Sequence, residues 1–270
     1  MARTPKLKRP QMQFLSMDVN HLGNPVASTS YYRILIDGQY IRYIHIDPDV
    51  YGQDVIESPP LLLEQLPPLP SHLNWNITHI TRSPAGKINA SSRREESREV
   101  TRLWHPKLVD ILSLNMINQR TTRVWEVVYE SSAAIAKIAR FDWEIKYAED
   151  ETLAYSLLDG HGIGPKFLGH LTEGGPKGRV VGLLIEKLEG RSAGIGDLVV
   201  CQEVLKALHA LGFIHGDVNR YNFIITEAGA RLIDFEEMKS GGTVEAMKKE
   251  LDSLEEQLIE DTGRGRALSP

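Results

Sequence analysis

Short runs of β-branched and aromatic residues alternate with polar or proline-rich stretches over the first 100 residues. Residues 31–36 and 39–46 are two such runs, and Asp37-Gly38 lies between them. Both positions tolerate a positive φ, so the pattern predicts a β-hairpin. We expect the proline-rich stretch 58–71 to form a stiff spacer rather than a ligand for a proline-recognising domain. We expect the polar stretch 83–99 to form an exposed, mobile loop.

From Trp104 onward the pattern changes to a compact series of strands and helices. Helices are predicted where apolar residues recur every three or four positions, at 142–159, 197–211 and 243–261. Strands are predicted where apolar runs are bounded by turn residues, at 109–116, 124–129, 133–139, 166–172, 179–185, 223–226 and 230–233. Gly212 is expected to cap the second helix. These elements predict an α+β fold in which residues 1–103 are a β-containing extension and residues 104–270 are the main domain.

The composition is that of an ordinary globular protein, with 41% hydrophobic and 25% charged residues. No uncharged apolar run reaches about 18 residues, so we expect no membrane span. No apolar signal-peptide core follows the basic start, so we expect a cytoplasmic protein, with a nuclear location as the alternative. The only cysteine, Cys201, lies in an apolar helical pattern and is expected to be a buried small hydrophobe.

Charge is distributed unevenly along the chain. The first ten residues are basic through Arg3, Lys6, Lys8 and Arg9, and contain no acid. We interpret them as a short solvated tail, with a nuclear or nucleic-acid-binding arm as the alternative. The net charge of −5 gives no general reason to expect a nucleic-acid partner.

The most informative stretch is His-Gly-Asp-Val-Asn-Arg-Tyr-Asn at 215–222, followed by Leu-Ile-Asp-Phe-Glu at 232–236. Phosphoryl transfer from ATP needs a carboxylate that accepts the proton of the attacking hydroxyl, and oxygen ligands that hold Mg²⁺. Asp217 and Asn222 are five residues apart on one predicted loop, and Asp234 follows a short predicted hairpin. The spacing therefore predicts three oxygen groups on one side of a small sheet.

This set of residues resembles the protein-kinase-like superfamily, whose catalytic loop reads H-R-D-x-x-x-x-N and whose metal motif reads D-F-G. The matching residues are His215, Asp217, Asn222, Asp234 and Phe235. Gly216 replaces the arginine of the loop, as is usual in aminoglycoside phosphotransferases and in the small atypical kinases of the tRNA-modification complex. Glu236 replaces the glycine, and Ile-Asp-Phe-Glu resembles choline kinases. The match is also close to small fungal kinase-like proteins, and it covers residues 109–261.

The resemblance implies a two-lobed fold with an N-lobe over about 104–186 and a truncated C-lobe over about 190–261. It implies that Asp217 is the catalytic base and that Asn222 and Asp234 hold the metal. His215 is expected to be structural.

Ile-Ala-Lys at 135–137 resembles the strand whose lysine binds the ATP phosphates, so Lys137 takes that role by resemblance. Glu151 would be its ion-pair partner, with Glu149 and Glu144 as competitors. Leu-Ile-Glu-Lys-Leu-Glu-Gly at 184–190 resembles the hinge.

In the hinge, adenine would be bound by the backbone C=O of Glu186 and the N–H of Leu188. The resemblance also implies that the adenine ring is sandwiched by Val124, Ile135 and Ile224. A glycine-rich loop should precede Val124, but residues 118–124 contain no glycine. Thr121, Thr122 and Arg123 are candidates to replace that loop with hydroxyl groups and charge.

The sequence thus predicts an ATP- and Mg²⁺-dependent phosphotransferase acting on a hydroxyl, with a serine or threonine of a protein as acceptor. Little sequence follows the metal motif from which an acceptor pocket could be built, which favours a protein substrate or partner. One alternative is a small-molecule kinase of the choline or aminoglycoside type. The other is a nucleotide-binding pseudokinase scaffold, which the missing glycine-rich loop favours. The final helix is expected to pack on the C-lobe, although its apolar residues could also form a short coiled-coil seam.

Overall fold

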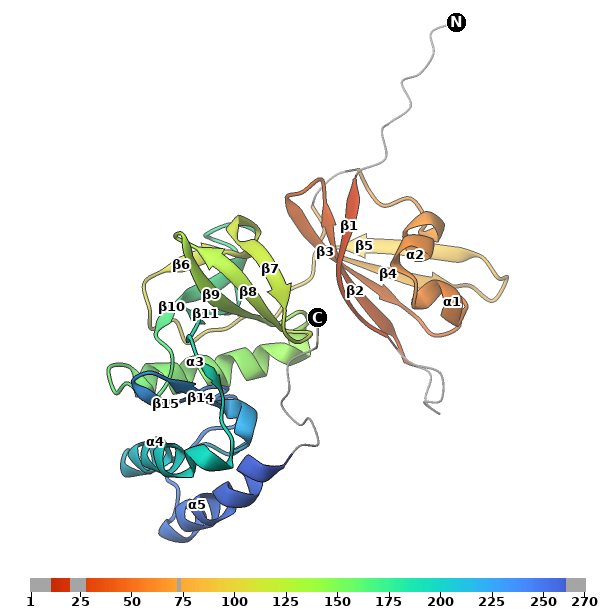
Figure 1. Cartoon of the computed structure of the whole chain (residues 1–270). Helices are drawn as coiled ribbons and strands as arrows, with labels where there is room; N and C mark the ends of the chain where they lie inside the picture. The colour runs from red at the N-terminus through yellow and green to blue at the C-terminus, as the bar shows by residue number, and fades with distance from the viewer. Residues whose placement is uncertain (1–10, 20–27, 72–73, 261–270) are drawn as a thin grey trace, which may run out of the picture. The chain divides into compact units, whose positions relative to one another are not determined.

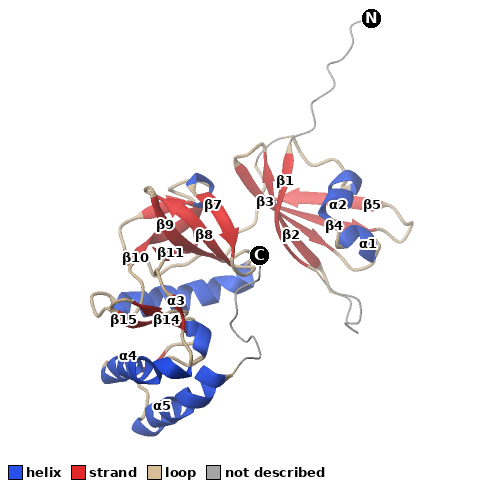
Figure 2. Cartoon of the chain, in the orientation of Figure 1, coloured by secondary structure: helices blue, strands red, loops and turns tan. Residues whose placement is uncertain are grey.

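A computed structural model of the chain describes residues 11–19, 28–71 and 74–260. These residues form an α+β structure with mixed sheets and five α-helices (Figures 1 and 2). The chain divides into two compact units, Met1–Ser97 and Arg98–Pro270. No described helix is long and apolar enough to cross a membrane.

Two predicted features lie outside the described residues. They are the basic arm of residues 3–9 and the last residue of the final helix, Asp261. The division between the units falls after Ser97, whereas the sequence pattern placed it after residue 103. Residues just beyond Ser97 belong to the second unit because the backbone N–H of Val100 donates to the carbonyl oxygen of Val180 at 2.9 Å.

The first unit is a five-stranded sheet with two short helices. Its elements are β1 (Met12–Asp18), β2 (Ser30–Ile36), β3 (Tyr40–Ile46), α1 (Gln53–Ile56), α2 (Pro59–Gln65), β4 (Ile77–Arg82) and β5 (Ile88–Arg93). The strands follow chain order, and neighbours are antiparallel except β3 and β4, which the helical crossover makes parallel. One face of the sheet packs with the helices around Ile34, Ile44, Leu62 and Trp75.

The predicted hairpin is confirmed in this unit. Strands β2 and β3 pair antiparallel, and Asp37 and Gly38 between them have φ values of 50° and 69°. Ile36 pairs with Tyr40, so the connection also includes Gln39 and is one residue longer than the pattern predicted.

Two expectations for this unit are wrong. The stretch 58–71 is not simply a spacer, because Pro59–Gln65 forms α2. Proline is compatible with the first turn of a helix, and Leu62 of this helix is only 1% exposed in the core. The stretch 83–99 is not simply a loop, because Ile88–Arg93 forms β5. Its polar side chains are compatible with an edge strand whose backbone is paired on one side only.

The second unit begins with a six-stranded sheet and one long helix. The elements are β6 (Leu108–Asp110), a 3₁₀ turn (Ile111–Ser113), β7 (Asn115–Gln119), β8 (Val124–Tyr129), β9 (Ser132–Ile138), a 3₁₀ turn (Asp142–Glu144), α3 (Ile145–Leu158), β10 (Phe167–Glu173) and β11 (Arg179–Glu186). The strand order is β6-β10-β11-β9-β8-β7, with β6 parallel to β10, and α3 packs against β11 (Figure 1).

The single strand predicted at 109–116 is therefore wrong. It is broken by the 3₁₀ turn into β6 and β7, which lie at opposite ends of the strand order. Asp110 causes the break, because its side chain accepts a hydrogen bond from the backbone N–H of Leu112 at 3.1 Å and caps the turn.

The rest of the second unit is helical with two small sheets. Its elements are β12 (Arg191–Ser192), a 3₁₀ turn (Ile195–Asp197), α4 (Leu198–Ala210), β13 (Phe213–Ile214), a 3₁₀ turn (Arg220–Asn222), β14 (Phe223–Thr226), β15 (Gly229–Leu232), β16 (Lys239–Ser240) and α5 (Val244–Ile259). The hairpin predicted from the strands at 223–226 and 230–233 is confirmed as β14–β15, and β12 adds a third strand to this sheet. The predicted cap is confirmed, since Gly212 has a φ of 84° just beyond α4.

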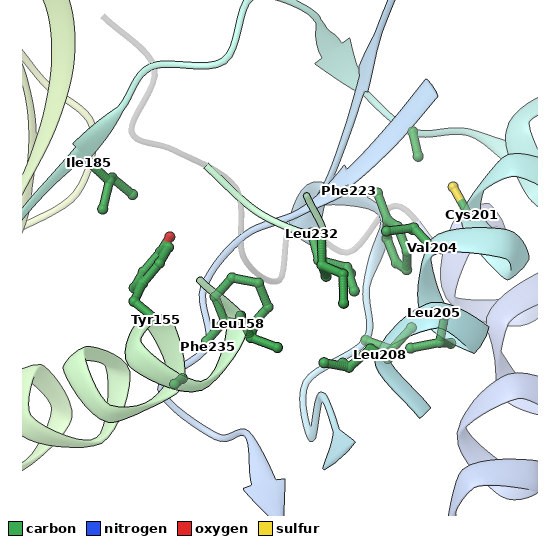
Figure 3. Packing of buried hydrophobic residues seen from close by; sticks show 14 of the residues in the cluster. Tyr155, Leu158, Ile185, Cys201, Val204, Leu205, Leu208, Phe223, Leu232 and Phe235 are labelled. Atoms are coloured by element: carbon green, nitrogen blue, oxygen red, sulfur yellow. The ribbon is translucent and has the colours of Figure 1, made fainter. Parts of the chain in front are cut away.

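A shared apolar core joins these elements. Figure 3 shows Phe223 and Leu232 of the hairpin close to Leu205 and Leu208 of α4. Cys201 lies in the same core and is 0% exposed, as predicted.

The final helix contributes to this core through Leu254 and Leu258, whereas Val244 at its start is 77% exposed. Packing on the body of the unit is thus confirmed for its C-terminal half. The first apolar position of the possible coiled-coil seam faces solvent instead.

Candidate functional site

Three elements of the second unit converge on one lysine. Lys137 lies in β9, Glu151 lies in α3 and Asp234 follows β15. The Nζ atom of Lys137 is 2.7 Å from Oε1 of Glu151 and 2.7 Å from Oδ1 of Asp234. The Glu151 side chain is 1% exposed and that of Lys137 is 12% exposed. Glu151 and Asp234 are 83 positions apart in the sequence, so only the tertiary fold brings this group together.

The electrostatics of the group follow from burial and from its two signs of charge. Burial disfavours the charge on Lys137, but Glu151 and Asp234 outweigh it and raise the pKa of the amine. Burial raises the pKa of Glu151 to about 7, even though Lys137 acts in the opposite direction. Burial also disfavours the charge on Asp234, but Lys137 more than compensates and lowers its pKa. Burial and the lysine therefore shift the pKa values of the two carboxyl groups in opposite directions.

Of the three glutamates considered as partners of the lysine, Glu151 is the one that contacts it. The carboxylate of Glu149 instead accepts hydrogen bonds from the backbone N–H and the hydroxyl of Thr101, at 2.7 and 2.9 Å. The carboxylate of Glu144 pairs with Arg140.

A second group of polar side chains lies on the loop before β14. The Nδ2 atom of Asn222 donates to the backbone oxygen of Asp217 at 2.8 Å and to its Oδ2 at 3.1 Å. Asn219, which the sequence pattern did not single out, also donates from Nδ2 to that Oδ2 at 3.1 Å. Two amides thus fix the orientation of the Asp217 carboxylate, and the opposite end of the Asn222 amide, Oδ1, is the end that can bind a cation.

Backbone contacts tie this loop to the segment that carries Asp234. The N–H of Ile233 donates to the carbonyl oxygen of Asn222 at 3.0 Å. The Nε2 atom of His215 lies 3.0 Å from the carbonyl oxygen of Ile233, which can only accept, so this ring nitrogen carries the proton. Burial lowers the pKa of His215 and keeps it neutral, which agrees with its expected structural role. Asp234 itself has a φ of 66°, a conformation that is uncommon for a non-glycine residue.

Glu250 of α5 is a residue at this site that the sequence analysis missed. Its carboxylate accepts hydrogen bonds from the backbone N–H of Gly216 at 2.7 Å and of His215 at 3.2 Å, and it lies 2.7 Å from Nε2 of His209. Its position among several other acids in a helical pattern is no signal for this role. Gly216 has a φ of 87°, and a Cβ atom there would lie 2.3 Å from the carbonyl oxygen of Glu237. No side chain, including the arginine of H-R-D, fits at this position.

A series of aromatic rings continues from this loop into the six-stranded sheet. The ring of Phe235 lies 5.5 Å from that of His215 and 5.4 Å from that of Tyr155, measured between centroids. Tyr155 in turn lies 5.8 Å from Phe167 of β10. Figure 3 shows Tyr155 and Phe235 packed side by side beneath Ile185. The segment after β15 is thereby anchored to the sheet through ring contacts.

The residues expected to sandwich adenine come from two different sheets. Val124 is the cross-strand partner of Lys137, and Ile135 lies two residues before it, so these three side chains share one face of the sheet. Ile224 belongs to another sheet, where it pairs with Arg231 and Ser192.

The expected hinge residues lie at and beyond the end of β11. Glu186 and Leu188 help to line a cavity of about 570 Å³ together with Tyr155, Arg231 and Phe235.

One charged side chain lies on the face that was expected to be apolar. Glu126 is the cross-strand partner of Ile135 and therefore shares its face. Its carboxylate pairs with Lys187 at 2.6 Å and with Arg120. Hydrogen bonds from these two cations lower the pKa of Glu126. This network could not be predicted from the sequence, because an acid in a strand does not indicate which basic residues it will pair with.

Oxygen ligands for a cation gather around Asp234. Within the described ranges, Glu151, Asp234 and Glu236 each offer a carboxylate oxygen within 4.8 Å of the others. The Oε2 atom of Glu151 is buried without a hydrogen-bond partner. An all-oxygen set of this kind suits a hard cation such as Mg²⁺. Glu236 was identified from the sequence only as the replacement for a glycine, and the structure adds it to the possible metal ligands.

No protein-family model matches this sequence, and no curated protein matches it.

Proposed function

We propose that residues 98–260 form a minimal two-lobed, kinase-like domain that transfers a phosphoryl group from ATP to a hydroxyl with Mg²⁺ as cofactor. The position of Lys137 supports this most strongly, because its Nζ lies 2.7 Å from an oxygen of both Glu151 and Asp234. One carboxylate would neutralise a buried lysine. A second, on the segment after β15, gives the lysine a partner that it can exchange for a phosphate oxygen.

Each side chain then has a defined role. Lys137 binds the α- and β-phosphates, and Glu151 orients it. Asp217, held by the amides of Asn219 and Asn222, accepts the proton of the attacking hydroxyl.

The carboxylate oxygens of Asp234 and Glu236, which lie close together, and the amide oxygen of Asn222 are of the kind that suits Mg²⁺. When bound, the metal neutralises charge on the phosphates. Adenine would lie under Val124 and Ile135, beside Glu186 and Leu188.

We propose a serine or threonine of a protein as the acceptor. A cavity of about 610 Å³ is lined by Arg191, Ile195, Arg220 and Ile259. Arg220, in the wall of this cavity, belongs to the loop that carries the proposed base Asp217, three residues away. Ile195 and Ile259 are 47% and 59% exposed. Exposed apolar side chains beside a cavity suit a polypeptide segment better than a small polar alcohol. A cytoplasmic or nuclear location would supply both ATP and such acceptors.

A nucleotide-binding scaffold without catalysis is the second candidate. The observation that favours it lies in the turn between β7 and β8, where the N–H groups of Arg120 and Thr121 donate to the carbonyl oxygen of Val124 at 2.8 and 3.2 Å. Backbone groups that are already paired cannot bind phosphate as a glycine-rich loop does.

Transfer of radiolabelled phosphate from ATP in the presence of Mg²⁺ separates these functions. Acceptors should include a mixture of generic proteins and, separately, small alcohols such as choline and an aminoglycoside. We expect protein labelling that falls on the order of 10²–10⁴-fold in Asp217→Asn, with ATP affinity little changed. Asp252→Asn, on the exposed face of α5, is the matched control and should remain fully active.

The other outcomes are equally informative. Labelling of a small alcohol alone would identify a small-molecule kinase. Binding of Mg²⁺-ATP without transfer would identify a scaffold. Absence of any ATP binding would refute the proposed function.

A further inference from the structure

The turn that joins β7 to β8 stands where a kinase-like protein would hold the ATP phosphates with backbone N–H groups. Here three of those groups donate within the turn: Arg120 and Thr121 to the carbonyl oxygen of Val124, and Val124 to that of Thr121 at 3.4 Å. The N–H of Arg123 donates to Oγ1 of Thr121 at 3.3 Å. A phosphate approaching this turn therefore has to be held mainly by side-chain charge.

Two arginines of this turn carry such charge, and each is paired with a different glutamate. Arg120 pairs with Glu126, which belongs to the neighbouring strand β8. Arg123 pairs with Glu236, and NH2 of the arginine lies 2.8 Å from Oε2 of the glutamate across 113 positions of sequence. Only the second pair joins the turn to the segment that follows Asp234.

The environment of Arg123 keeps its charge and limits its freedom. Burial disfavours the charge, but the hydrogen bond and the charge of Glu236 outweigh it and raise the pKa of the guanidinium. The guanidinium carbon lies 4.9 Å from the centre of the Tyr147 ring, a cation–π distance. The side chains of Arg123 and Glu236 are 28% and 16% exposed, so the pair is accessible at its edge.

Glu236 belongs to the same cluster of three carboxylates as Asp234. Arg123 thus neutralises a carboxylate that the proposed function assigns to the metal. In this structure the charge that would bind phosphate, on Arg123, is therefore paired with the charge that would bind metal, on Glu236.

We propose that Arg123 is the phosphate-binding residue that replaces the glycine-rich loop, and that Mg²⁺-ATP binds by exchanging the Arg123–Glu236 ion pair. Arg123 leaves Glu236 for a phosphate oxygen, and Glu236 turns to the metal. Each charge gains a new partner of opposite sign, so neither is left buried and unpaired. This inference rests on the proposed function and identifies how its nucleotide is recognised.

A double-mutant cycle on nucleotide binding tests the exchange. ATP affinity is measured by calorimetry, once with EDTA and once with Mg²⁺, for wild type, Arg123→Gln, Glu236→Gln and the double variant. With EDTA, Glu236→Gln should bind ATP about tenfold more tightly than wild type, because Arg123 is released. With Mg²⁺, the same variant should lose most of the gain in affinity that the metal gives to wild type.

The cycle separates the exchange from a simple loss of repulsion between Glu236 and ATP. In the Arg123→Gln background, Glu236→Gln should give clearly less than the tenfold gain. Arg120→Gln is the matched control, since it removes a charge from the same turn and leaves Glu236 paired. Arg123→Lys keeps the charge and should lose less affinity than Arg123→Gln, which gives a second measure if the glutamine variant folds poorly.

Two results would overturn the proposal. They are an equal gain from Glu236→Gln in both backgrounds, or an equal loss of ATP affinity in Arg120→Gln and Arg123→Gln. If wild type binds Mg²⁺-ATP and either result is found, the exchange fails while the proposed function stands. If wild type binds no ATP with or without Mg²⁺, both fail.

Discussion

Glu250 accepts a hydrogen bond from the backbone N–H of Gly216 at 2.7 Å, and this bond ties helix α5 to the loop that carries Asp217. The same carboxylate also binds the N–H of His215. The loop therefore depends for its shape on a residue of the last described helix, 34 positions later in the chain. Removing this carboxylate would take the acceptor from the N–H of the buried His215 and from that of Gly216, which is exposed.

Glu250→Ala should lower the free energy of unfolding by about 1–3 kcal/mol, because it leaves the N–H of the buried His215 without an acceptor and removes the hydrogen bond from Gly216. It should also reduce the proposed phosphoryl transfer, since Asp217 would lose its fixed position. Urea denaturation and the labelling assay measure the two effects. Glu255→Ala on the exposed side of α5 is the control and should change neither. Equal behaviour of the two variants would show that Glu250 does not brace the loop.

Gly216→Ala should destabilise the protein far more than Gly212→Ala, although both glycines have a φ near 85°, at 87° and 84°. A Cβ at Gly212 meets no atom within 4 Å, so only the backbone strain of roughly 1 kcal/mol is expected there. A Cβ at Gly216 would lie 2.3 Å from the carbonyl oxygen of Glu237, so backbone has to move and the loss should reach roughly 2–4 kcal/mol. Thermal melts of the two variants give the comparison, and similar melting temperatures would contradict it.

Lys137→Met should raise the pKa of Glu151 further above its value of about 7, because it removes the charge that opposes the effect of burial. The carboxyl signal of Glu151 in ¹³C NMR, followed as a function of pH, reports this pKa directly. Mg²⁺-ATP binding should weaken at the same time. Lys187→Met, which removes the partner of Glu126 instead, is the control. An unchanged Glu151 titration in Lys137→Met would show that the ion pair is not formed in solution.

Stability should fall as the pH decreases below about 6.5, in part because of His170. This side chain is 0% exposed, and burial lowers its pKa from 6.5 to about 4. Between these two values the unfolded chain binds one more proton than the folded chain, so the free energy of unfolding decreases with falling pH by at most about 1.4 kcal/mol per pH unit. Urea denaturation between pH 5 and 6.5 measures this slope, and His170→Gln should make it shallower. An unchanged slope in His170→Gln would assign the effect to other groups.

The helix α2 allows a test with two neighbouring leucines. Leu62 is 1% exposed, whereas Leu61 is 42% exposed. Leu62→Ala should lower the free energy of unfolding of the first unit by about 3 kcal/mol through the lost burial and the cavity left behind. Leu61→Ala should change it by less than about 0.5 kcal/mol. Fluorescence of Trp75, which lies in the same core, is a suitable signal. Equal effects would mean that residues 59–65 do not pack as this helix.

Local patterns were sufficient to predict the elements whose boundaries have strong turn signals. The hairpin around Asp37-Gly38, the end of α4 at Gly212 and the hairpin β14–β15 belong to this class, because glycine or an Asp-Gly pair acts within a few residues. Four residues of the candidate site could be identified from the sequence for the same reason, because each lies in a short motif. They are Lys137, Glu151, Asp217 and Asp234.

What the pattern missed depends on contacts between distant residues. The prolines at 59 and 60 favour the predicted stiff spacer, but burial of Leu62 favours a helix that begins at these prolines. The strand β5 has weak strand propensity and is held by pairing with β4. The roles of Glu250 and of the Arg123–Glu236 pair require the fold, since no local motif relates residues that are 34 and 113 positions apart.

The burial of Phe235 has a consequence for the design of ligands that bind beside it. Its ring is 1% exposed between His215 and Tyr155, and removing it from the core would cost about 3 kcal/mol or more. A compound that binds only after the ring has left would lose roughly a hundredfold in affinity to that rearrangement. The cavity of about 570 Å³ beside the ring, with Lys166 and Glu186 in its wall, can be reached without moving it. Compounds that pair a flat apolar body with one charged group should therefore be directed to this cavity, with Phe235 left in place.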